Sequence, residues 1–105
     1  MAQFDVYENP SKQTREAYPY IVDIQHGLLG NIATRIVVPL GDARKFRNEE
    51  LKGVTPKVSF EGKNLLVLMP QIASMNAKSL KEPVGTLSHL RDEIVSALDL
   101  AITGI

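Results

Sequence analysis

The sequence predicts an α+β fold, mainly β, in which an antiparallel sheet of about five strands is followed by one C-terminal helix. Short segments before residue 80 alternate between apolar and polar residues, and Glu61-Gly62 separates two of them by a hairpin-length turn. Residues 87–105 have helical periodicity instead. Runs of strands followed by one helix are typical of antiparallel α+β domains, so we expect residues 1–105 to form a single domain.

The composition is that of a globular protein without a strong field of either sign. The chain has 105 residues, 44% of them hydrophobic, and its 12 basic and 12 acidic residues give a formal net charge of zero. A neutral chain lacks the long-range attraction that phosphate backbones usually demand, so we expect no direct sequence-specific nucleic-acid binding by the protein alone. Near-zero net charge also permits self-association.

Cysteine usage and the N-terminal sequence bear on the compartment. The chain has no Cys, which rules out disulfides and thiolate metal sites. The start MAQFDVYENP has neither a basic n-region nor an apolar h-region, and the longest aliphatic run, 65–69, is far too short to span a membrane. We therefore expect a soluble, cytoplasmic protein without membrane contact.

Residues 3–7 are predicted to form the first strand, because Phe4 and Val6 alternate with polar neighbours and share one face. Residues 8–17 follow as a polar segment that contains Pro10. Such a segment is expected to be an exposed loop.

Residues 18–25 alternate again and form the clearest predicted strand. Asp23 is expected on its hydrated face, with a hydrogen-bonded, partly buried carboxylate as the alternative. Residues 26–34 carry glycines and should turn the chain. Leu28 and Leu29 lie in this turn, and the sequence leaves open whether they fold back into the core or are exposed for contact.

Residues 35–40 are apolar on both faces and predict a buried strand that closes at Pro39. Residues 41–53 are highly charged with alternating signs, which is typical of a solvated loop or helical turn.

Residues 57–60 and 63–69 flank the Glu61-Gly62 turn and predict a hairpin, because Gly62 can adopt the positive φ that the turn needs. Pro70 ends the second of these segments. Residues 71–79 are a further strand candidate.

The final helix is predicted from apolar residues that recur at steps of three and four and should cover one face of the sheet. Ser88 is the best N-cap candidate. The last turn has no cation to neutralise it, so its end is either a loose terminus or a contact for a partner. The residues of the apolar arc are Leu90, Ile94, Ala97, Leu98, Ala101 and Ile105.

The sequence contains no recognisable catalytic or metal-binding cluster. Ser88 and His89 are the only Ser-His neighbours, and adjacent side chains on a helix diverge. His26 and His89 are the only imidazoles, and they lie far apart in the sequence. We therefore predict no catalytic residues, no metal and no cofactor, and a protein that works by binding.

Short segments spread over the whole chain keep one order and near-constant spacing. They are Gln3–Tyr7, Val22–Gln25, Val38–Leu40 with Ala43-Arg44, Leu87–His89 and Gly104-Ile105. Together they resemble the CcdB family, small bacterial toxins of toxin-antitoxin modules. The resemblance implies a homodimer, a sheet related to the SH3-like barrels with a C-terminal helix, and the poisoning of DNA gyrase.

The resemblance also implies which residues bind each partner. In that family the end of the helix, helped by the first strand and the loop after the second, enters the gyrase A subunit dimer and traps the enzyme while its DNA is cut. The implied gyrase-binding residues are Gln3, Phe4, His26, Leu28, Leu29, Asp99, Ile102, Thr103, Gly104 and Ile105. The cognate antitoxin is expected to bind separately, through Glu8, Asn9, Ser11, Lys12 and Arg15.

Three positions depart from the family pattern, which has Trp where this chain has Thr103, Asn where it has Asp99 and Ser where it has His26. Thr103 cannot stack on a partner arginine, an interaction worth about 0.5 to 2 kcal/mol. These departures change the expected affinity and leave the Gly104-Ile105 end in place.

Two other functions stay open at the level of sequence. One is an endoribonuclease toxin on a related SH3-like barrel, with Arg35, Arg44 or His26 as the nearest catalytic candidates, although a neutral chain lacks the basic groove that favours RNA. The other is a dimeric binding protein that keeps the fold and is not toxic.

Overall fold

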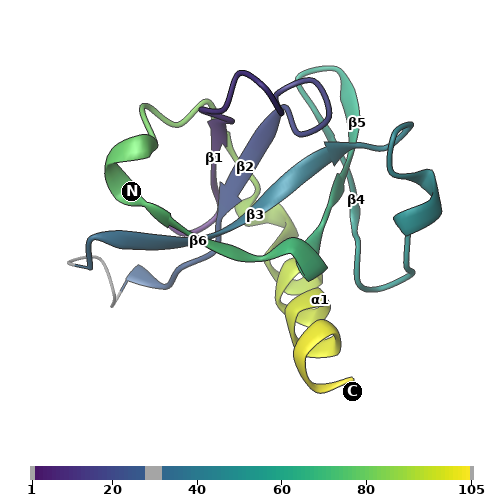
Figure 1. Cartoon of the computed structure of the whole chain (residues 1–105). Helices are drawn as coiled ribbons and strands as arrows, with labels where there is room; N and C mark the ends of the chain where they lie inside the picture. Colours follow the sequence, from purple (N-terminus) through teal and green to yellow (C-terminus); the bar gives the residue numbers. More distant parts are fainter. Residues whose placement is uncertain (1, 28–31, 105) are drawn as a thin grey trace.

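The computed structural model describes residues 2–27 and 32–104. These residues form an antiparallel sheet with one α-helix, as Figure 1 shows, which confirms the predicted α+β fold. The strands of the described part are β1 (Asp5–Glu8), β2 (Tyr20–Asp23), β3 (Thr34–Asp42), β4 (Lys57–Phe60), β5 (Lys63–Val67), β6 (Ala73–Asn76) and β7 (Gly85–Thr86). The sheet has seven strands where the sequence predicted about five: the candidate strand over residues 71–79 contains β6, and β7 is too short to show alternation in the sequence.

β3 lies at the centre of the sheet, whose strand order is β4-β5-β3-β2-β1-β7. One edge of β3 pairs with β2, and the other edge pairs with β6 and then with β5. Val37, for example, lies opposite Asp23 of β2 and opposite Ala73 of β6. A strand that changes partners along one edge bends, and the sheet curves into a half-barrel.

The predicted strand end at Pro39 was wrong, because β3 continues to Asp42. Proline lacks a backbone donor but keeps its carbonyl, and the carbonyl of Pro39 accepts the amide of Leu68 at 3.0 Å. A proline inside a strand is therefore compatible with pairing when only its acceptor is needed.

The turn between β4 and β5 is the predicted hairpin. Glu61 and Gly62 have φ values of 51° and 76°, and Phe60 pairs with Lys63 directly beside them. A two-residue turn with two positive φ values matches the right-handed twist of its strands. The hairpin prediction is confirmed.

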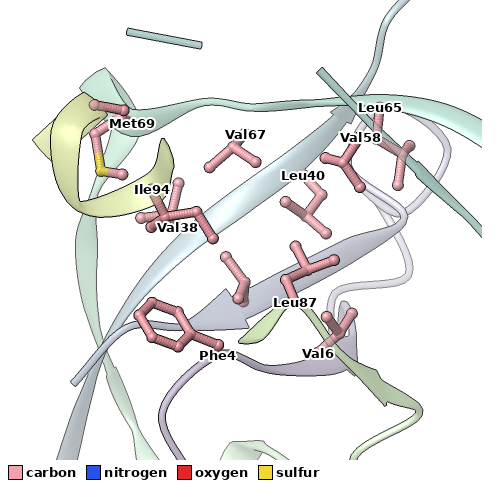
Figure 2. Packing of buried hydrophobic residues seen from close by; sticks show 12 residues of the cluster. Phe4, Val6, Val38, Leu40, Val58, Leu65, Val67, Met69, Leu87 and Ile94 are labelled. Carbon is pink, nitrogen blue, oxygen red and sulfur yellow. The ribbon is translucent and has the colours of Figure 1, made fainter. Parts of the chain in front are cut away.

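The main hydrophobic core lies between the sheet and α1 (Arg91–Thr103), and Figure 2 shows its packing. Val22, Val38 and Leu40 share the sheet face that meets Ile94 of the helix. The buried members are Phe4, Val6, Val22, Val38, Leu40, Val58, Leu65, Val67, Met69, Leu87, Ile94 and Ala97. A second cluster buries the opposite face and comprises Tyr7, Ile21, Val37 and Leu80. The middle of the sheet is therefore buried on both faces.

The C-terminal helix continues a 3-10 turn formed by Ser88–Leu90. Ser88 is not its N-cap as predicted: the residue lies inside this turn, and its amide donates to the hydroxyl of Thr86 at 3.1 Å. The predicted apolar face is buried only in the first half of the helix. Ala101 and Ile102 are exposed, because the second half of α1 extends beyond the sheet toward the C-terminus (Figure 1).

Within the described residues, the structure contains no helix that is both long and apolar enough to cross a membrane.

Replacing Tyr7 by Phe should raise the stability of the protein. The Tyr7 side chain is buried in the second cluster, and its hydroxyl has no hydrogen-bond partner among the described residues. An unpaired buried hydroxyl costs about 1 to 3 kcal/mol, so we expect a gain up to that size and a higher Tm. An unchanged or lower Tm would show that the hydroxyl makes a bond to water.

The Tyr7→Phe variant should also lose less stability than wild type as the pH is raised. Burial, with smaller contributions from the charges of Asp5 and Asp23, raises the pKa of Tyr7 above its usual value of 10.0. A raised folded-state pKa means that stability is fully present below the unfolded pKa and is lost as the pH rises through the folded pKa. Wild-type protein should therefore destabilise more steeply above about pH 10 than Tyr7→Phe, as measured by denaturant titration.

Candidate docking site

The end of α1 is an exposed apolar tip. Ile102 is 68% exposed, and no basic residue lies in the last turn of the helix. Gly104 ends the helix with a φ of 74°, its amide donates to the carbonyl of Leu100 at 3.0 Å, and a Cβ at this position would meet nothing within 4 Å. Gly104 thus forms a left-handed cap at the end of α1. Ile105 lies outside the described residues.

Two side chains stand beside this cap on the polar side of the helix. Asp99 is exposed, and its carbonyl accepts the hydroxyl of Thr103 at 2.6 Å. This bond ties the Thr103 side chain to the helix, in place of the indole that the family pattern has there. The partial negative charge of the helix end and the carboxylate of Asp99 give the tip an anionic rim.

Gln3 and Phe4 lie in a turn before β1 and not in the strand predicted over residues 3–7, and hydrogen bonds join this turn to the end of β2. The side-chain amide of Gln3 donates to the carbonyl of Ile24 at 3.1 Å, and the amide of Phe4 donates to the carbonyl of Asp23. His26 follows two residues later and is exposed. The structure therefore brings together the Gln3 and His26 segments, while Leu28 and Leu29 lie outside the described residues.

Phe4 differs from the other predicted contact residues because its side chain is only 3% exposed and belongs to the main core. Its φ of 73° is unusual for a residue other than glycine. The backbone explains the position: the carbonyl of Phe4 accepts the amide of Leu87 at 2.8 Å, next to the start of the helix. The Phe4 ring is therefore not available to a partner. Phe4 instead supports Gln3 by anchoring the turn in the core.

The loop between β1 and β2 carries the predicted antitoxin residues, and Asn9 organises it. The Asn9 side chain, 7% exposed, donates to the hydroxyl of Thr14 at 3.0 Å and to the carbonyl of Tyr18 at 2.8 Å, and it accepts the amide of Ser11 at 2.9 Å. Arg15 donates to the carbonyl of Asn9 at 2.9 Å. Asn9 therefore holds the loop together from inside.

The remaining predicted antitoxin residues lie on the surface. Glu8, Ser11 and Lys12 are exposed, and Arg15 is half-buried and pairs with Glu8 at 3.2 Å. This loop presents both charges and a hydroxyl to solvent on a backbone fixed by Asn9.

A charged hollow of about 570 Å³ lies beside this loop, and no sequence pattern predicted it. Bonds from Arg44 to Asp42 hold the pKa of that carboxyl below its usual value, so the pair stays ionised to low pH. More of the lining side chains are cationic than acidic. The lining residues are Arg15, Glu16, Pro19, Asp42, Arg44, Lys45, Gly62, Lys63, Asn64 and Leu65.

Asp23 and Arg35 form a buried ion pair, so the expectation of a hydrated Asp23 was wrong. The Asp23 side chain is 0% exposed and the Arg35 side chain 2%, with 2.7 Å between Arg35 Nη2 and Asp23 Oδ2. Alternation places Asp23 on the same face of β2 as buried Ile21. Asp23 lies opposite Val37 of β3, and Arg35, two residues before Val37, shares that face and so lies diagonally beside Asp23. The burial of Asp23 could have been predicted from one feature of the sequence: a carboxylate in one predicted strand and an arginine in the next.

The structure gives no support to an RNA-cleaving site built from Arg35, Arg44 and His26. Arg35 is too deeply buried to reach a phosphate, and Arg44 is exposed but already bonded to Asp42. Among the described residues, no three His, Cys, Asp or Glu side chains lie close enough to hold a metal ion.

Comparison with known families agrees with this geometry. The family model described as "CcdB protein" matches residues 3–104 and so covers nearly the whole chain. The match includes the first strand, the loop between β1 and β2, the buried pair and the helix up to its glycine cap. The chain belongs to the CcdB family, whose members are toxins of toxin-antitoxin modules that poison DNA gyrase and are not enzymes.

Proposed function

We propose that the protein docks on the gyrase A subunit dimer through the end of α1, next to the Gln3 and His26 segments, and traps gyrase while its DNA is cut. We call these residues the docking surface. They are Gln3, His26, Leu28, Leu29, Asp99, Ile102, Thr103, Gly104 and Ile105, with Phe4 as their support. Because gyrase acts on the bacterial chromosome, we expect the protein in the cytoplasm.

The observation that carries this proposal is the bare tip of α1. Ile102 is 68% exposed, and the C-terminal end of α1 extends beyond the sheet (Figure 1), where another molecule can cover it. Gly104 lets a partner backbone approach closely, because nothing occupies the space around its Cα. The anionic rim from Asp99 and the helix end favours a cationic partner surface.

A cleavage assay tests the proposal. Purified protein is incubated with gyrase, ATP and supercoiled plasmid, and in parallel with RNA alone. We expect linear plasmid after denaturation of trapped complexes and intact RNA. Unchanged plasmid with no measurable binding to gyrase A would refute the proposal, and cut RNA would support the endoribonuclease instead.

The protein should form a homodimer in solution. Ile36 is 39% exposed on the face of β3 that carries Val38 and Leu40. A second copy would bury this apolar side chain, and zero net charge offers no repulsion against it. Light scattering at micromolar concentration should report twice the chain mass, and a single species of 11.6 kDa would refute the dimer.

Reversing the charge of one loop residue should weaken antitoxin binding without affecting gyrase. We propose that Glu8, Ser11, Lys12 and Arg15 contact the antitoxin, on the backbone that Asn9 fixes. Lys12→Glu should slow antitoxin association several-fold in a binding kinetics experiment, since charges at the rim of an interface act mainly on the association rate. The matched control is Lys52→Glu, which changes an exposed lysine in another loop. Equal rates for both variants would exclude Lys12 from the contact.

A further inference from the structure

We propose that the buried pair Asp23–Arg35 is a positioning device for the docking surface. Neither side chain can touch gyrase, because both lie inside the sheet. Their role would be to fix the segments that carry Gln3 and His26 in the geometry that docking needs. The inference rests on the proposed docking to gyrase.

The pair is tightly built. Arg35 donates to Asp23 Oδ2 through Nε at 2.8 Å and through Nη2 at 2.7 Å, so a guanidinium edge meets one carboxylate oxygen with two donors. The other carboxylate oxygen, Oδ1, accepts the amide of Gln25 at 2.9 Å. Both oxygens of Asp23 are therefore engaged.

Gln25, the residue before His26, is held at two further points, and its neighbour Ile24 is held at one. Its carbonyl accepts Arg35 Nη2 at 3.4 Å, and its side-chain oxygen accepts the amide of Ile36 at 3.0 Å. The amide of Ile24 donates to the carbonyl of Ile36 at 3.0 Å. Since β2 ends at Asp23, these bonds continue to fix the chain after the strand ladder has stopped.

The backbone of residues 23 and 24 also binds the turn that precedes β1. Gln3 bonds to the carbonyl of Ile24 and Phe4 to the carbonyl of Asp23, so a shift of residues 23–25 would displace both. Two segments of the docking surface thus depend on one buried pair.

Stability alone does not account for an ion pair at this place. Arg35 is the largest fully buried side chain among the described residues. Replacing a buried ion pair by apolar residues of similar volume is often neutral or stabilising. What apolar residues cannot supply is the directional bond network from Arg35 and Asp23 to Gln25. This is the property that a positioning role requires.

The test compares Asp23→Leu/Arg35→Met with wild type and with the surface control Glu50→Leu/Lys57→Met, which removes an exposed pair of 3.1 Å. Melting temperature, affinity for the gyrase A subunit and hydrogen exchange of residues 25–27 are measured on the same preparations. We expect the buried double variant to fold, to bind gyrase about tenfold more weakly and to exchange faster at residues 25–27, because loosened segments must be ordered on binding. The surface control should match wild type in all three.

Each outcome decides between the possibilities. Wild-type affinity together with wild-type exchange in a folded double variant would overturn the inference. If that variant does not fold, Arg35→Lys takes its place. Lysine keeps the charge but has one donor nitrogen in place of the planar guanidinium fork. Unchanged affinity and unchanged exchange in this variant would again overturn the inference. If wild-type protein itself does not bind gyrase, the proposed function fails. Independently of that result, unchanged hydrogen exchange at residues 25–27 in the variant would show that the buried pair does not position this segment.

Discussion

Replacing Gly104 by Glu should abolish gyrase binding and toxicity while the fold survives. The new side chain would fill the open space at the tip where a partner backbone should approach. Its carboxylate would also be repelled by Asp99 and by the helix end, and it would be costly to desolvate in a docked complex. Stability should change little, because a Cβ at Gly104 meets no neighbour and a left-handed non-glycine residue costs about 1 to 2 kcal/mol at most. Surface plasmon resonance against gyrase A and thermal melting measure the two properties.

The chain offers a closely matched control in Gly62→Glu. Gly62 has a φ of 76° against 74° for Gly104, and its Cβ position is equally open. The control therefore introduces the same charge and similar backbone strain in the β4–β5 turn, away from the docking surface. If both variants bind gyrase as wild type does, or if the control loses binding equally, the assignment of the helix tip is wrong.

Replacing Arg35 alone by Met should produce the largest loss of stability. Asp23 would remain buried with no cation beside it, and breaking a buried pair in this way costs about 3 to 5 kcal/mol. Native stabilities are about 5 to 15 kcal/mol, so Tm should fall by roughly 10 to 40 °C. Denaturant and thermal unfolding followed by circular dichroism provide the measurement.

Two comparisons identify the cause of this loss. Adding Asp23→Leu to Arg35→Met should recover most of the stability, because no unpaired charge remains. Lys57→Met breaks an exposed pair with Glu50 and should cost no more than about 1 kcal/mol. An Arg35→Met protein that melts like wild type would show that the pair contributes nothing to the fold.

Local patterns predicted the elements whose physics is local. The hairpin at Glu61-Gly62 follows from the positive φ values that a two-residue turn needs, and the cap at Gly104 follows from the same property of glycine. The helix predicted by apolar residues at steps of three and four is also present, as α1. In each case, neighbours in the sequence are sufficient to determine the conformation.

Predictions that depended on distant partners succeeded less often. Ser88 was expected to cap the helix, but Thr86 supplies the oxygen because β7 places it there. Pro39 was expected to end its strand, but Leu68 pairs with its carbonyl. The helix was expected to cover one face of the sheet, but only its first half does so, because its second half extends beyond the sheet (Figure 1).

The sequence by itself determined the α+β class, the hairpin and the helix, since periodicity and turn chemistry act over a few residues. Only the tertiary structure decided that Asp23 is buried against Arg35, that Phe4 supports Gln3 from the core, and that the end of α1 projects from the sheet. Burial and ion pairing depend on strand register and sheet curvature, which bring residues far apart in the chain into contact. Alternation alone cannot tell whether the face opposite the core is open to water or covered, as it is here by the second cluster around Tyr7.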